Sequence, residues 1–128
     1  MKKRIFSGAS VEDYAAYSRA VIDDEWAFVS GTIGLDPETK KLPEDAQAQA
    51  TNCIRNIEVA LREADMTLDD IVRCRVFITD VAVLDDVAKV LRAYFDKRRP
   101  ANTTLIAGIP APGAVVEIEA TARRGSSQ

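Results

Sequence analysis

The chain has 128 residues, of which 47% are hydrophobic and 29% charged, the size and balance of one globular domain. Its net charge of −3 argues against nucleic-acid binding, because a nucleic-acid footprint is basic. The sequence contains no histidine, which excludes Ser-His-Asp and Cys-His catalysis and any histidine-ligated metal site.

The first third of the chain is rich in strand-forming residues. Short strands are predicted at residues 3–6 and 18–22, and a longer strand is predicted at Trp26–Ile33. Asp36 and Pro37 then begin a turn. No apolar run approaches the length of a membrane span or a signal-peptide core, so a cytoplasmic protein without membrane partners is expected.

Residues 44–65 show the three-to-four spacing of a helix with one buried face, with Pro43 near its first turn. The predicted buried positions are Ala46, Ala50, Cys53, Ile54, Ile57, Ala60, Leu61 and Ala64. The predicted polar positions are Gln47, Gln49, Arg55, Glu58 and Arg62.

The second half of the chain predicts a strand, a helix and two more strands. Residues 71–79 alternate, and Val72, Cys74, Val76 and Ile78 share one side. A helix over about residues 83–97 ends before Pro100, and strands are predicted near 103–107 and 114–122. The predicted buried stripe of that helix is Leu84, Val87, Ala88, Leu91, Tyr94 and Phe95.

The resulting order, βββ-α-β-α-ββ, predicts an α+β fold with one mixed sheet and two helices packed on one face. We predict a single domain over residues 1–124 and a flexible tail over residues 125–128. The predicted helix-free face mixes both charges with an aromatic ring, which indicates an interface or the lining of a cleft. A solvated face with incidental ion pairs is the alternative. The predicted residues of the helix-free face are Arg73, Arg75, Phe77, Glu117 and Glu119.

Several segments resemble the RidA family, also called YjgF or L-PSP endoribonuclease, in order and spacing over about residues 17–123. They are residues 17–21, residues 28–31 with Asp36-Pro37, Asn52 and Asn56 in the first long helix, residues 76–80, and residues 100–105 followed by 117–120. The resemblance implies a RidA/chorismate-mutase-like fold and a homotrimer with sites in the clefts between subunits. It also implies hydrolysis of reactive enamines and imines, without a cofactor, to a keto acid and ammonia.

The resemblance also implies the residues of the site. Glu117 matches the family glutamate that orients the attacking water, and Tyr17 matches a tyrosine that lines the site. Ser30 and Gly31 stand near a strand end, where backbone groups can approach a ligand. Thr104 matches a position whose backbone N–H helps to bind a carboxylate. For Glu117 the alternative is a solvated or salt-bridged strand glutamate, and for the other residues it is packing or ordinary strand and turn structure.

Asn102 occupies the position at which the catalytic members have an arginine that grips the substrate carboxylate. An asparagine donates only neutral hydrogen bonds, so affinity for a 2-imino acid is expected to fall on the order of a hundredfold or more. A substitute cation remains possible, and the candidates are Arg73, Arg75, Arg98 and Arg99. Cys53 and Cys74 fall on apolar faces, which predicts inert packing and neither metal binding nor catalysis.

Three functions follow as hypotheses. The first is a hydrolase, or deaminase, acting on a small enamine or imine that differs from the substrate of the arginine-containing members. The second is a non-catalytic, regulatory trimer of the same fold that binds a small molecule. The third, a ribonuclease, is disfavoured by the acidic net charge and the absent histidine.

Overall fold

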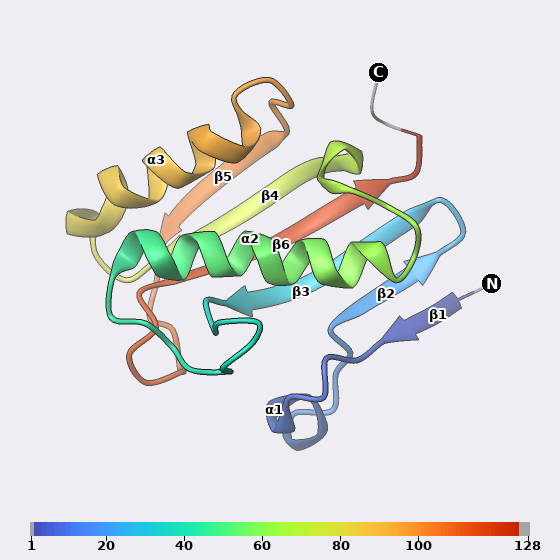
Figure 1. Cartoon of the computed structure of the whole chain (residues 1–128), viewed down its shortest axis with the longest axis horizontal. Helices are drawn as coiled ribbons and strands as arrows, with labels where there is room; N and C mark the ends of the chain where they lie inside the picture. Colours follow the sequence, from blue (N-terminus) through green and yellow to red (C-terminus); the bar gives the residue numbers. More distant parts are fainter. Residues whose placement is uncertain (1, 126–128) are drawn as a thin grey trace.

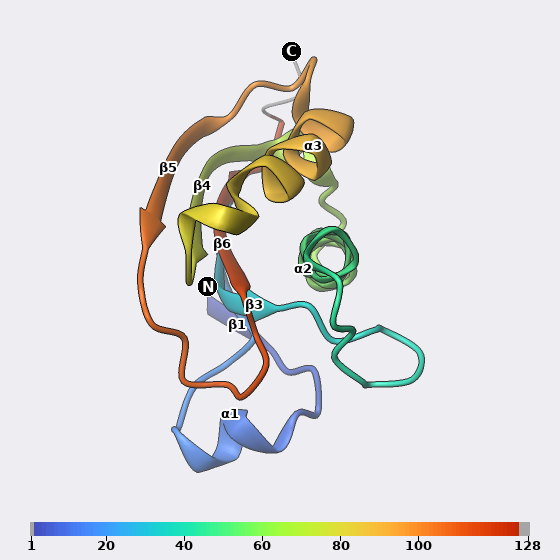
Figure 2. The same ribbon diagram turned by 90° about the vertical axis from the view of Figure 1, so that its left-hand side faces the viewer.

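The computed structural model describes residues 2–125. One six-stranded sheet has the strand order β1-β2-β3-β6-β4-β5, and helices α2 and α3 lie on the same face of it (Figures 1 and 2). Neighbouring strands are antiparallel except β4 and β5, which are parallel. The predicted α+β fold is therefore confirmed. Apart from Gly125, the tail predicted at residues 125–128 lies outside the described residues.

The elements differ from their predicted bounds by a few residues at the ends. The strands are β1 (Lys2–Ile5), β2 (Ala20–Asp23), β3 (Trp26–Ile33), β4 (Ile71–Ile78), β5 (Ala101–Ile106) and β6 (Val116–Arg123). The helices are α1 (Ser10–Tyr14), α2 (Ala46–Arg62) and α3 (Leu84–Phe95), with short 3-10 turns at Leu68–Asp70 and Val81–Val83. Helix α1 was not predicted, because five residues are too few to show a helical period.

The core lies between the two long helices and the sheet. Every apolar position predicted for α2 is buried, and so are alternate residues of β6. Removing one such large side chain from water contributes about 1.5–3 kcal/mol. This layer fixes which face of β6 is turned away from the helices. The buried residues of β6 are Val116, Ile118, Ala120 and Ala122.

The assignment of Gln49 to the polar face of α2 was wrong, because its side chain is 0% exposed. Its amide nitrogen donates to the carbonyls of Pro43 at 2.8 Å and Gly113 at 3.0 Å. Its carbonyl oxygen accepts from the N–H of Val115 at 2.9 Å. These bonds satisfy a buried amide with partners from distant loops, which a helical period cannot reveal.

Two smaller expectations also fail. In β4 the register shifts between Ile71 and Arg73, so Ile71 is buried and Val72 only half-buried. An extra residue in a strand turns the following side chains to the other face, which moves the alternation by one position. In α3, Leu84 is 39% exposed at the first turn, while Val90 joins the buried face.

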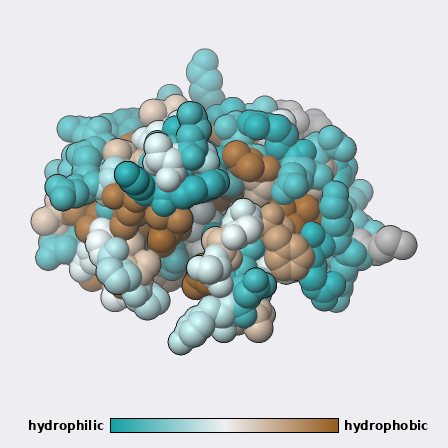
Figure 3. Space-filling model, turned by 60° about the horizontal axis from the view of Figure 1, so that its bottom comes forward, coloured by the Kyte–Doolittle hydropathy of each residue, from teal (hydrophilic) through white to brown (hydrophobic). Residues whose placement is uncertain are grey.

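Exposed apolar side chains are distributed over the surface as separate groups. On the side of the molecule that carries α1, brown apolar patches are interrupted by polar residues (Figure 3). Within the described residues, no helix has the length and hydropathy needed to cross a membrane. The exposed apolar residues around α1 are Phe6, Val11 and Tyr14.

Candidate functional site

The six predicted site residues fall into two groups that lie apart in one chain. Tyr17, Ser30, Gly31 and Glu117 come from the segment before β2, from β3 and from β6, and interactions through Arg19 connect this region. Asn102 and Thr104 lie on β5, at the end of the sheet beyond β4. We call the first group, together with Arg19, the Glu117 cluster.

The carboxyl group of Glu117 lies directly against Gly31. A Cβ atom at Gly31 would stand 2.9 Å from the carboxyl carbon of Glu117, which is closer than real Cβ contacts. The sheet register shows why the two meet. Between Val29 and Thr32 strand β3 carries one residue more than its partner segment of β6, which is a β-bulge at Ser30 and Gly31. Strand β3 therefore continues past Gly31, and the missing side chain leaves the space that the carboxyl occupies.

The environment of Glu117 raises the pKa of its carboxyl above the usual value. Burial is the main cause, because removing the carboxyl from water disfavours its charged form. The positive charge of Arg19 lowers the pKa in part, and the negative charge of Glu119 raises it. A half-buried carboxyl of this kind retains its proton to a higher pH than an exposed glutamate, which suits proton transfer near neutral pH.

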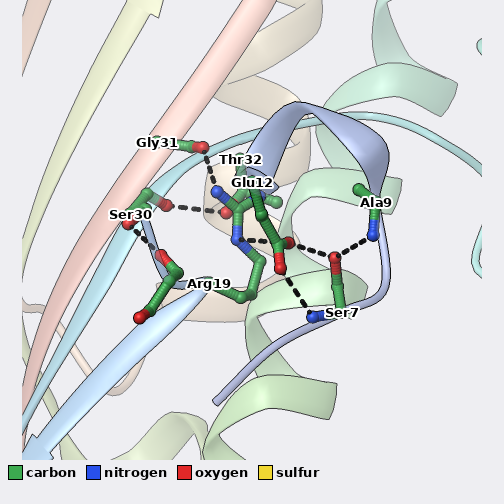
Figure 4. A network of polar contacts seen from close by, with 8 residues as sticks. Ser7, Ala9, Glu12, Arg19, Ser30, Gly31 and Thr32 are labelled. Carbon is green, nitrogen blue, oxygen red and sulfur yellow. Dashed lines mark hydrogen bonds and ion pairs between the residues drawn. The ribbon is translucent and has the colours of Figure 1, made fainter. Parts of the chain in front are cut away.

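Sequence reasoning missed Arg19, although it stands two residues after Tyr17. Its guanidinium donates to the carbonyl oxygen of Gly31 at 2.9 Å and lies 5.5 Å from the centre of the Tyr17 ring. The side chain is 12% exposed. The available signals were its position within residues 17–21, which resemble the family, and a charged residue at the start of a predicted strand. Figure 4 shows the guanidinium between the Gly31 carbonyl and the carboxylate of Glu12.

Ser30 uses both its backbone and its side chain within the chain. Its N–H donates to the carbonyl of Arg19 at 2.9 Å, and its hydroxyl donates to the carbonyl of Ser18 at 2.7 Å. Its own carbonyl accepts from the hydroxyl of Thr32 at 2.8 Å. These bonds fix the bulge in β3 to the segment that carries Tyr17 and Arg19.

Asn102 and Thr104 contact each other on β5. The Asn102 amide nitrogen donates to the Thr104 hydroxyl at 2.9 Å, and the Asn102 side chain is exposed. The parallel register pairs Asn102 with Cys74 and Thr104 with Val76. Both partners are buried on the helix-covered side of the sheet, so Asn102 and Thr104 belong to that side.

Glu117 belongs to the opposite side of the sheet. It pairs with Phe77 of β4, which in turn pairs with Leu105 of β5, on the face without helices. Strand β4 also stands between β6 and β5. One chain therefore does not bring Asn102 to Glu117.

Three of the four proposed substitute arginines have other partners, and Arg73 pairs in register with Thr121 of β6 and Ala101 of β5. Arg75 lies 3.8 Å from Glu119 on the helix-free face, and the interaction is exposed. Arg98 and Arg99 follow the end of α3. Arg98 pairs with Asp69, and Arg99 pairs with Asp96. Arg19 is the cation whose charge acts on Glu117.

The remaining reactive groups and hollows lie elsewhere. Burial raises the pKa of the Cys74 thiol to about 11 and also raises the pKa of Cys53, so both are protonated near neutral pH.

Two surface hollows of about 720 and 350 Å³ lie beside α3 and near the start of α2, and neither is lined by a predicted site residue. Among residues 2–125, no group of three or more His, Cys, Asp or Glu side chains could hold a metal ion.

Replacing Gly31 with alanine tests the contact with Glu117. The new methyl group should push the Glu117 carboxyl toward water, so its pKa should fall toward the usual value while the chain stays folded. Carboxyl titration by ¹³C NMR measures this, and urea unfolding should change by less than about 1 kcal/mol. Gly108→Ala is the matched control, because a Cβ there meets nothing within 4 Å. An unchanged Glu117 titration in Gly31→Ala would contradict the packing described.

Comparisons with known proteins agree with this architecture. The family described as Endoribonuclease L-PSP matches residues 8–124. The chain is 34% identical to the RutC family protein UK114 of Drosophila melanogaster and 30% identical to the 2-iminobutanoate/2-iminopropanoate deaminase of Rattus norvegicus, each over 98% of this chain and 92% of the relative. A crystal structure of a YjgF/YER057c/UK114 family member from Mycobacterium tuberculosis superimposes with a TM-score of 0.87 at 35% identity, covering 96% of this chain and 99% of that one.

Proposed function

Because this chain belongs to the endoribonuclease L-PSP family, we propose that it is a hydrolase that converts a small reactive imine or enamine into a carbonyl compound and ammonia. The observation that carries the proposal is the Glu117 carboxyl, half-buried against Gly31 and acted on by the charge of Arg19, whose guanidinium lies over the Tyr17 ring. A relative with 30% identity over nearly the whole chain is named as a 2-iminobutanoate/2-iminopropanoate deaminase.

The proposed chemistry requires a water, a proton acceptor and a bound imine. The imine carbon is already electrophilic, so no cofactor is needed to activate it. Glu117 accepts a proton from the water as the water oxygen bonds to the imine carbon, and it passes this proton to the imine nitrogen. In the resulting carbinolamine the hydroxyl proton is transferred to the amino nitrogen, the C–N bond breaks to release ammonia, and the hydroxyl oxygen forms the C=O bond. In this proposal Tyr17 and the Gly31 backbone orient the substrate.

The substrate proposed here carries no simple α-carboxylate. Asn102 supplies no positive charge, and its amide already donates to Thr104. Arg19 donates to the Gly31 carbonyl and forms an ion pair with Glu12, so its guanidinium already has partners within the chain. A neutral imine, or an imine whose negative charge lies elsewhere, fits this site better than a 2-imino acid.

We also propose that the site is completed between subunits of a homotrimer. Asn102 and Thr104 of one chain would then approach the Glu117 cluster of its neighbour, since the two groups lie on different sides of one sheet. The helix-free face also exposes Trp26 and Phe28, whose rings stack with centres 6.3 Å apart. Exposed aromatic side chains on a sheet face are typical of an interface.

Sedimentation and ammonia release test the proposal together. Sedimentation at micromolar concentration should give about three times the mass of one chain, and a stable monomer there would contradict the shared site. Freshly generated imines, with and without an α-carboxylate, should release ammonia faster with the protein than without it, with the carboxylate-free compounds preferred. No acceleration with any imine in the panel would contradict the hydrolase.

The second candidate function is a trimer that binds a small molecule without turning it over. The neutral Asn102–Thr104 pair at the position of the family arginine favours it, because a site without that cation lacks the group that anchors a substrate carboxylate. A compound that raises the melting temperature without releasing ammonia would support binding alone.

A further inference from the structure

Arg19 of the Glu117 cluster forms a buried ion pair with Glu12, a residue that has no part in the proposed chemistry. The carboxylate of Glu12, on α1, lies 4.0 Å from Nε of Arg19. Their side chains are 3% and 12% exposed. Opposite charges removed from water persist only when they are paired or hydrogen-bonded, so this pair needs a reason.

The N-terminal segment holds the Glu12 carboxylate in place. The N–H of Ser7 donates to one Glu12 oxygen at 3.0 Å, and the Ser7 hydroxyl donates to the other. The Ser7 hydroxyl in turn accepts from the N–H of Ala9 at 3.2 Å (Figure 4). The backbone carbonyl of Glu12 accepts from the N–H of Tyr17 at 2.9 Å. Helix α1 is thereby fixed beside the residues that precede β2.

Arg19 connects Glu12 on α1 to the backbone of Gly31 in the site. One guanidinium nitrogen donates to the carbonyl of Gly31, the residue on which the Glu117 carboxyl rests. Its Nε is buried and meets no hydrogen-bond acceptor among the described residues, because Glu12 is too distant for a hydrogen bond. Glu12 therefore holds the guanidinium by charge and neutralises it only in part, which leaves positive charge to act on Glu117.

We propose that Arg19 is a positioning residue for Glu117: it fixes the backbone of Gly31, against which the Glu117 carboxyl packs, and serves as the internal cation of that carboxyl, and Glu12 holds Arg19 in place. The consequence for the rate rests on the proposed hydrolase, whereas the consequence for the Glu117 charge does not. Arg19 is not a clamp for a substrate anion, because its side chain is almost buried and already engaged.

The charged and titratable groups around Glu117 come from several elements. Arg19 precedes β2, Glu119 lies on β6, and Cys53 lies on α2 and is itself affected by the Glu117 charge. Glu12 on α1 acts through Arg19. Since Arg19 is the positive member of this set, it limits how far burial can raise the pKa of Glu117.

Three substitutions test the proposal through the sign of their effects. Arg19→Gln removes the cation and keeps an amide donor for the Gly31 carbonyl, so the pKa of Glu117 should rise. Glu12→Gln keeps one of the two oxygens that accept from Ser7 and removes the negative charge beside Arg19, so the pKa of Glu117 should fall. Arg19→Lys keeps the charge and should stay close to the wild type. The probe is the ¹³C NMR titration of the Glu117 carboxyl in the full chain.

The pH dependence of hydrolysis provides the second readout. Glu117 must be ionised to accept a proton, so its higher pKa in Arg19→Gln moves the acidic limb of kcat/KM to higher pH. At a fixed pH on that limb we expect roughly a tenfold loss, restored by Arg19→Lys. Glu12→Gln should move the limb in the opposite direction.

Arg75→Gln is the matched control, because Arg75 lies on the same face but pairs with Glu119. It should shift the Glu117 titration much less than Arg19→Gln does. A general loss of structure would move Arg19→Gln and Glu12→Gln in the same direction, and that result would overturn the proposal. So would an unchanged Glu117 titration in Arg19→Gln. If no imine is hydrolysed, the NMR titration still decides the role of Arg19 and separates it from the failure of the hydrolase.

Discussion

Glu117→Gln is expected to lower imine hydrolysis by about 10²–10⁴-fold, the usual contribution of a general acid–base group. Glutamine keeps the shape that rests against Gly31 and removes the group that accepts the proton from water. The chain contains no histidine that could take over this role. Ammonia release under kcat/KM conditions measures the loss, and sedimentation should show that the assembly is unchanged.

Glu119→Gln is the control for this substitution. Glu119 lies two residues along β6 on the same face, but its carboxylate lies 3.8 Å from Arg75. Its loss should change hydrolysis only slightly, through the small effect of its charge on the pKa of Glu117. Equal and small effects of both substitutions would place the two glutamates in a structural charge network and would favour the binding protein.

Asn102→Arg is expected to raise the affinity for an imine with an α-carboxylate on the order of a hundredfold, because it restores charged hydrogen bonds in place of neutral ones. The exposed Asn102 leaves room for a longer side chain on the edge strand β5. The gain should appear as a lower KM for the carboxylate-bearing imine, measured by ammonia release. Imines without the carboxylate should show no such gain.

Thr103→Arg is the matched control for the restored arginine. It adds the same charge on β5, but the register pairs Thr103 with Arg75 on the other side of the sheet. It should therefore give no gain for the carboxylate-bearing imine. Strong activity of the wild type on that imine would instead mean that a cation from another position reaches the site. Arg75 and Arg99 would then be the first to replace.

Local sequence patterns were sufficient to predict most of the fold and the face of the sheet on which Glu117 lies. The period of α2 and the alternation of β6 each depend on a few neighbouring residues and on one buried layer, so they predict the apolar residues of the buried faces correctly. The alternation of β6 also places Glu117 on the helix-free face. The resemblance in residues 100–105 and 117–120 identified the family, which the match over residues 8–124 confirms.

The contacts within the site were decided by the tertiary structure. The bulge at Ser30 and Gly31 adds one residue to β3, and only this register brings Gly31 under Glu117. Arg19 reaches the same point because its segment is hydrogen-bonded to Ser30 and its charge is held by Glu12 from α1. The composition and the spacing of apolar residues determine which side chains are buried. Which charged groups meet depends on the register of strands and on loops far apart in the chain, and no local pattern contains that information.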